Sequence, residues 1–205
     1  MVPKLSDERD TKLQKVIQEI SKFHGKAAPG VYIGAYMVDL AQELLGSNFT
    51  KLNAISETNV CLSDAVQVMT GCTIGNKYLW LHDFGLYAMT LYDRETKDGF
   101  RVFVDYAKIT NDTPTLKKFF DGSRKFDKIP RPVQQKMVVE EFLTVKRDIL
   151  SFQKVKVNQP TKPKLRPLSK CDQCNDFFRT QIDQDDQNIC PFCINGSNIY
   201  TFINE

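Results

Sequence analysis

Long apolar runs are missing from this 205-residue chain, and so is the apolar core of a secretory signal peptide. Residues 1–15 are polar, and no hydrophobic stretch approaches the roughly 20 residues that cross a bilayer. We therefore expect a cytoplasmic protein without a membrane partner. In that compartment the six cysteines are expected to act as metal ligands or thiols rather than as disulfides.

Familiar catalytic motifs are also missing: the sequence contains no phosphate loop, dinucleotide fingerprint, nucleophile elbow or metalloprotease helix. It has only two histidines and one tryptophan. A formal net charge of +3 is too small to imply a nucleic-acid or membrane partner by itself. The hydrophobic content of 41% and the charged content of 26% are typical of a globular protein with one medium and one small domain.

The C-terminal segment carries two Cys-x-x-Cys pairs. The first is Cys171 and Cys174, and the second is Cys190 and Cys193. Thiolates on two such tight turns converge on one tetrahedral ion, and Asn175 tolerates the left-handed backbone that the first turn needs. We predict one structural zinc per chain, because four thiolates leave no open coordination position for catalysis. Unrelated thiol pairs or disulfides are the alternative.

The charge of residues 169–205 bears on what this module contacts. It holds two basic residues and six acidic ones (Lys170 and Arg179; Asp172, Asp176, Asp183, Asp185, Asp186 and Glu205). Phosphate binding needs a positive face, so nucleic acid is not the expected partner. We expect the acidic ribbon to contact protein.

Changes in composition divide the chain into a core domain (residues 1–153), a linker (154–168) and a zinc ribbon (169–205). Residues 154–170 hold six basic residues, three prolines and no acidic residue, which is typical of a stiff, solvated linker. Short strands are expected at Phe177 and Phe178 and at residues 199–203 of the ribbon.

Glycine, proline and periodicity predict helices and strands in the core domain. The first helix is expected to begin at Asp10 and end at Gly25, the second to run from Pro29 to Gly46, and the third from Ser63 to Gly71. Helices also follow at 114–120, closed by Gly122, and from Pro132 onwards. Strands are expected at 52–57, 78–83, 87–92 and 100–106, with an Asp98-Gly99 hairpin turn before the last. The predicted fold is α+β: an antiparallel sheet packed by helices, followed by the ribbon.

Two segments of the core domain resemble a known family. Residues 63–93, SDAVQVMTGCTIGNKYLWLHDFGLYAMTLYD, resemble the central signature of the FmdE-like family of formylmethanofuran dehydrogenase proteins. Residues 23–37, FHGKAAPGVYIGAYM, occupy the place of that family's His-Gly-His-x-Cys-Pro-Gly motif, and some members carry a C-terminal four-cysteine module. The resemblance implies kinship with an accessory component linked to formylmethanofuran dehydrogenase, a molybdenum or tungsten enzyme of carbon dioxide reduction.

The resemblance also points to a cleft. In the family, the motif and the downstream cysteines line a metal-binding cleft, but here Lys26 replaces the second histidine and Ala28 the motif cysteine. His24, Cys61 and Cys72 remain as candidate ligands. A cation at Lys26 opposes tight metal binding and favours an anion. The same residues also have a purely structural interpretation, in which the cysteines are buried and His24 satisfies the carbonyls at a helix end.

Three functions follow as hypotheses. The first is a zinc-binding, non-catalytic accessory protein, expected to be a homodimer because the apolar helix faces exceed what one small sheet can cover and because the resemblance points the same way. The second is a small-molecule enzyme that uses a cleft at His24, Cys61 and Cys72. The third is a nucleic-acid-associated ribbon protein.

Overall fold

The computed structural model describes residues 1–46, 51–121, 129–163, 165–180 and 188–196. The chain divides into a main unit, Met1–Lys162, and a C-terminal unit, Pro163–Glu205. The main unit contains a five-stranded sheet and the C-terminal unit a two-stranded one, which confirms the predicted α+β class. None of the helices in the described ranges is long and apolar enough to cross a membrane.

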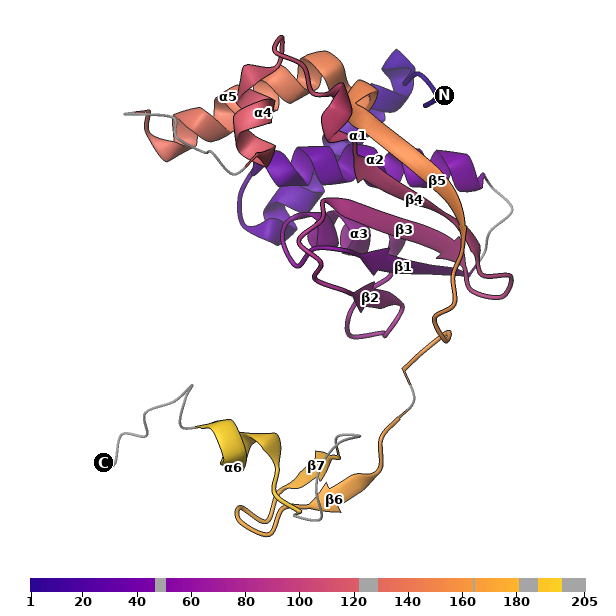
Figure 1. Ribbon diagram of the computed structural model, residues 1–205, viewed down its shortest axis with the longest axis vertical. Helices are drawn as coiled ribbons and strands as arrows, with labels where there is room; N and C mark the ends of the chain where they lie inside the picture. Colours follow the sequence, from indigo (N-terminus) through magenta and orange to yellow (C-terminus); the bar gives the residue numbers. More distant parts are fainter. Residues whose placement is uncertain (47–50, 122–128, 164, 181–187, 197–205) are drawn as a thin grey trace. The chain divides into compact units, whose positions relative to one another are not determined.

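The sheet of the main unit has the strand order β2-β1-β3-β4-β5 (Figure 1). Its strands are β1 (Leu52–Ser56), β2 (Leu79–Leu81), β3 (Ala88–Asp93), β4 (Asp98–Val104) and β5 (Leu150–Lys156). Neighbouring strands are antiparallel, except that β1 and β2 are parallel. This pair departs from the antiparallel sheet that the sequence predicts, because helix α3 (Leu62–Thr70) forms a crossover between the two strands.

Helix α2 lies at the centre of the core of the main unit. The other helices are α1 (Asp7–His24), α4 (Pro114–Phe120) and α5 (Arg131–Val145), with short 3-10 segments η1 (Tyr106–Lys108) and η2 (Lys146–Ile149). Helix α2 (Pro29–Leu45) packs against α1, α3 and α5 and against strands β3 and β4 (Figure 1). Nearly all of its side chains are buried, as expected of a helix that is apolar on every face.

Several helix ends lie where glycine and proline predict them. Helix α2 begins at Pro29, and α1 and α3 are closed by Gly25 and Gly71 with φ of 83° and 69°, values that favour glycine. The predicted N-caps are wrong. The start of α1 is capped by Ser6 rather than Asp10, and Ser63 lies inside α3 with its hydroxyl donated to a loop carbonyl.

The hairpin between β3 and β4 forms as predicted, but its turn precedes Asp98 and Gly99. Lys97 takes the left-handed conformation with φ of 66°, and Asp93 caps the turn. Gly99 lies in β4 opposite Tyr92, where a Cβ atom would be 2.4 Å from the Tyr92 Cβ. The glycine is therefore required for close strand packing rather than for turning the chain.

The strands depart from strict alternation. All six side chains of β3 are buried, because this strand is central in the sheet, and β2 is only three residues long. Strand β5 continues to Lys156, so the sheet includes the first three residues of the stretch predicted as linker. The predicted closure of α4 at Gly122 lies outside the described residues.

The C-terminal unit contains an antiparallel pair, β6 (Leu168–Lys170) and β7 (Phe177–Arg179), and a short helix, α6 (Pro191–Asn195). The strand expected at residues 177–178 is therefore confirmed. The strand predicted at 199–203 lies outside the described residues.

Candidate functional site: a thiol-lined cavity and a four-cysteine cluster

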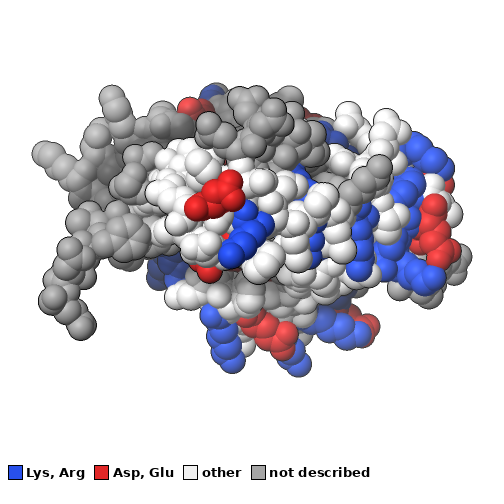
Figure 2. Space-filling model, turned by 90° about the horizontal axis from the view of Figure 1, so that it is seen from below, with Lys and Arg blue, Asp and Glu red and all other residues white. Residues whose placement is uncertain are grey.

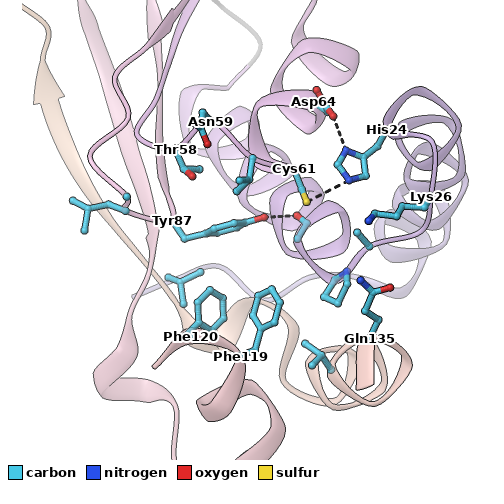
Figure 3. Close-up of a pocket in the computed structure, with 18 of the residues that line it drawn as sticks. His24, Lys26, Thr58, Asn59, Cys61, Asp64, Tyr87, Phe119, Phe120 and Gln135 are labelled. Carbon is cyan, nitrogen blue, oxygen red and sulfur yellow. Dashed lines mark hydrogen bonds and ion pairs between the residues drawn. The ribbon is translucent and has the colours of Figure 1, made fainter. Parts of the chain in front are cut away.

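A cavity of about 900 Å³ opens in the main unit (Figure 3). The connection between α1 and α2 and the loop between β1 and α3 form one part of its wall. The segment that precedes β3, with Tyr87 at the start of that strand, and helices α4 and α5 form the rest. Segments far apart in the sequence thus converge on one space, which is of the size that small-molecule sites in proteins have.

His24, Cys61 and Asp64 form a chain of contacts at the cavity wall (Figure 3). The Sγ atom of Cys61 lies 3.4 Å from Nε2 of His24, and Nδ1 of His24 lies 2.6 Å from Oδ2 of Asp64. With a carboxylate at Nδ1, that nitrogen carries the proton, which leaves the lone pair of Nε2 directed at the thiol. A thiol, a base and a group that orients the base are therefore in line.

Local structure accounts for this arrangement. His24 is the last residue of α1. Cys61 occupies the N-cap position of α3 and Asp64 follows three residues later, a spacing that places both side chains on one face of the helix. The preceding loop is held by Ser63, whose hydroxyl donates to the carbonyl of Thr58 at 2.9 Å.

The thiol occupies space that Gly30 leaves open. A Cβ atom at Gly30 would lie 3.1 Å from Sγ of Cys61 and 2.6 Å from the hydroxyl oxygen of Tyr87. That hydroxyl donates to the carbonyl of Gly30 at 2.5 Å. Desolvation, and the charge of Cys61 when it is ionised, raise the pKa of Tyr87 well above its ordinary value, so the phenol stays neutral beside the cysteine.

The residues present do not fit the metal site that the resemblance implies. A separation of 3.4 Å between Sγ and Nε2 suits either a hydrogen bond or one edge of a coordination shell, but these atoms supply only two ligands. Zinc sites have three or four protein ligands. Asp64 is bonded to the opposite ring nitrogen of His24, Ala28 offers no donor, and Lys26 brings a cation to the same wall.

The structure separates Cys72 and His82 from the cavity. Cys72 is buried, its thiol donates to the carbonyl of Leu52 at 3.4 Å, and desolvation raises its pKa. The ring of His82 stacks on those of Trp80 and Phe84, with centroid distances of 6.3 and 5.7 Å. Of the four cleft residues predicted, His24, Lys26 and Cys61 line the cavity and Cys72 does not.

Other residues of the cavity are not predicted from the sequence. Asp64 could have been found from its spacing of three residues after Cys61 at a helix start. Tyr87, Phe119 and Phe120 carry no local signal. Their rings meet edge to face, with centroids 5.8 Å apart for Tyr87 and Phe120 and 5.0 Å for the two phenylalanines, and they form an aromatic wall.

The four cysteines of the C-terminal unit lie together. Their sulfur atoms are within 4.8 Å of one another, and they are the only group of three or more His, Cys, Asp or Glu residues in the described ranges that is placed to hold a metal ion. Asn175 has a φ of 65°, as predicted for the first turn. Desolvation acts to raise the pKa of Cys171, but N–H groups of Cys174 and Cys190 more than offset it and lower the pKa to about 6. Cys171, Cys174, Cys190 and Cys193 are therefore positioned to bind a metal ion.

Comparisons with known proteins agree with the geometry. The family model described as "FmdE, Molybdenum formylmethanofuran dehydrogenase operon" matches residues 23–157. The crystal structure of an FmdE-like protein of tungsten formylmethanofuran dehydrogenase from Syntrophus aciditrophicus is similar, with a TM-score of 0.73 and 34% identity, over 90% of this chain and 93% of that one.

A curated relative from Archaeoglobus fulgidus, named "Probable S-adenosyl-L-methionine-binding protein", is 39% identical over 102 residues, which are 46% of this chain. The match spans only 28% of that relative's length. The family model covers well over half of this chain, including the cavity-lining residues of α1, α3 and α5. The chain therefore belongs to the FmdE family.

Proposed function

We propose that this chain is a zinc-binding accessory protein whose main unit holds a small organic molecule in its cavity. The observation that carries the proposal is the cavity itself, which brings a thiol, an imidazole and an aromatic wall together in about 900 Å³. Pockets of this kind, mostly apolar with a few convergent polar groups, are the usual places for small ligands.

Zinc is the proposed ion of the four-cysteine cluster. Four thiolates in a closed tetrahedral set are typical of structural zinc, and a unit of this size has too small a core to be stable without it. Cysteine-to-serine variants at Cys171, Cys174, Cys190 and Cys193 are each expected to lose one zinc per chain by elemental analysis. Cys72→Ser is the matched control and should keep the zinc. Unchanged zinc content in all four variants would contradict this assignment.

A small molecule in the cavity would meet two kinds of wall. Phe119 and Phe120 offer apolar rings, whereas Lys26 and Gln135 offer an ammonium and an amide (Figure 3). In the described residues no ion pair joins Lys26 to an acidic side chain. A molecule with an apolar part and an anionic or polar part therefore suits the cavity.

S-adenosylmethionine is the first probe, because the relative from Archaeoglobus fulgidus is named for it and because the molecule is of a size for this space. Calorimetric titration should be carried out on the wild type and on Gln135→Trp, whose larger side chain would fill the cavity. Lys136→Trp is the matched control, since Lys136 is an exposed neighbour that does not line the cavity. Binding that is equal in both variants would place the ligand elsewhere.

An accessory protein needs a partner, and we propose a second copy of the chain. Large apolar side chains such as Phe84 and Leu86 are 67% and 50% exposed on the main unit. The acidic C-terminal unit is a second surface proposed to contact protein. Light scattering at micromolar concentration, repeated at high salt, should give the mass of a dimer, and a monomer would refute the first of these proposals.

Nucleic acid is the least favoured partner. On the face drawn in Figure 2, acidic side chains accompany the lysines and arginines, and much of the remaining surface is uncharged. A phosphate backbone is bound most strongly by a continuous basic face. An enzyme is the second candidate function, and it is favoured by the line of contacts from Cys61 through His24 to Asp64.

A further inference from the structure

We propose that Cys61 is a nucleophile that accepts an acyl group from a thioester, with His24 as its base and Asp64 as the residue that orients the base. This inference rests on the proposed role of the cavity as a small-molecule site. It goes beyond that role by naming the reacting atom, the substrate class and the chemistry.

The geometry has the three parts that activate a nucleophile. The Cys61 thiol faces Nε2 of His24 at 3.4 Å, and Nδ1 of His24 is held by Asp64 at 2.6 Å. Contacts between nucleophile and base are often this loose before substrate binds and shorten in the complex. The carboxylate fixes the tautomer and stabilises the imidazolium that forms when the thiol proton moves to Nε2.

The position of the thiol supports the same role. Cys61 stands at the N-terminus of the nine-residue helix α3, where the helix dipole stabilises a thiolate. It is not sealed in the core: its side chain lines the cavity and is partly exposed. Cys72, in contrast, is 2% exposed and lies away from the cavity, so it provides an internal comparison within the same unit.

The walls of the cavity suit an acyl thioester. Phe119 and Phe120 can hold a short apolar acyl chain, and Lys26 can meet an anionic group on the carrier side of the substrate. Transfer of an acyl group between two sulfur atoms needs no oxidant, reductant or metal. It therefore uses only groups that the cavity supplies.

Each bond that forms in this transfer is matched by one that breaks. The Cys61 sulfur forms a bond to the carbonyl carbon, the bond from that carbon to the leaving sulfur breaks, and the proton taken up by His24 passes to the leaving thiolate. Water then attacks the S-acyl cysteine while His24 accepts one of its protons. The acid departs and the Cys61 thiol regains the proton, so a thioester and water become a carboxylic acid and a thiol.

The test uses the full-length protein and the acetyl thioester of N-acetylcysteamine as probe. Peptide mass spectrometry should find an acetyl group on Cys61 in the wild type and none at that peptide in Cys61→Ser. His24→Gln and Asp64→Asn should slow acetylation by about ten-fold or more, the usual size of a general-base contribution. Cys72→Ser and His82→Gln are matched controls and should react at the wild-type rate. Thermal melts establish that each variant is folded.

Three results would overturn the inference. One is the absence of acetyl-Cys61 in a folded wild type. Another is an acetylation rate that does not depend on His24 or Asp64. The third is a second zinc per chain that is lost in Cys61→Ser, which would make Cys61 a metal ligand. The proposed function fails separately: if Gln135→Trp reacts as fast as the wild type with acetyl and longer acyl thioesters alike, the thiol is reactive but the cavity selects no substrate.

Discussion

Replacing Gly30 by alanine tests the packing on which the cavity depends. The new Cβ atom would lie 2.6 Å from the Tyr87 hydroxyl oxygen, 2.9 Å from the Cβ of Cys61 and 3.1 Å from its Sγ. All three separations are shorter than ordinary van der Waals contact. The backbone of Gly30 is helical, so alanine brings no conformational strain and the whole effect comes from crowding.

Two contributions set the magnitude. Overpacking of a core position costs about 1–3 kcal/mol of unfolding free energy, and the better helix propensity of alanine returns at most about 1 kcal/mol. We expect a net loss of about 1–2 kcal/mol, which lowers the melting temperature of a unit of this size by roughly 2–8 °C. Displacement of the Cys61 thiol from His24 should also slow alkylation of Cys61 by iodoacetamide.

Differential scanning calorimetry measures the first effect, and peptide-resolved alkylation measures the second. Gly75→Ala is the matched control, because the nearest heavy atom to a Cβ there is 3.9 Å away. A Gly30→Ala protein that melts with the wild type and alkylates at the same rate would refute the close approach of Gly30 to Cys61 and Tyr87.

Three other positions give measurable effects. Phe142 is fully buried against the ring of Tyr36, and Phe142→Ala should lower the free energy of unfolding in urea by about 3–5 kcal/mol. Backbone N–H groups of Thr96 and Glu95 lower the pKa of Asp93. Its stabilisation is therefore present above the unfolded-state pKa of about 3.9 and is lost as the pH falls through the lower folded pKa. Asp93→Ala should be less stable than the wild type in urea at pH 7 but nearly equal to it at pH 2, and a constant difference would contradict the ionised cap. The double change Lys26→His and Ala28→Cys should add a second metal ion per chain by elemental analysis, whereas a count that stays at one would mean that more than these two ligands is missing.

The sequence predicts those parts of the fold that depend on local chemistry. Gly25, Pro29 and Gly71 bound helices because each residue restricts or frees the backbone where it stands. The four-cysteine cluster is predicted for a related reason, since the short spacing within each pair already brings two sulfur atoms together.

Features that depend on tertiary structure escape sequence reasoning. The parallel pairing of β1 with β2 is set by where α3 packs, not by the residues of either strand. Gly99 has the signature of a turn but serves a close strand contact. In the cavity, Cys61 and Cys72 are equivalent by residue type, and only the fold decides that Cys61 meets His24 while Cys72 faces Leu52.

The late position of β5 has a consequence for synthesis of the protein. Strand β4 ends at Val104, yet its partner β5 does not begin until Leu150. As the chain leaves the ribosome, one edge of the nascent sheet therefore stays unpaired until residue 156 has emerged, and open strand edges invite association with other chains. A fragment cut near Leu150 would keep that edge open permanently, so the shortest form of the main unit that could be handled without aggregation ends at Lys156 or later.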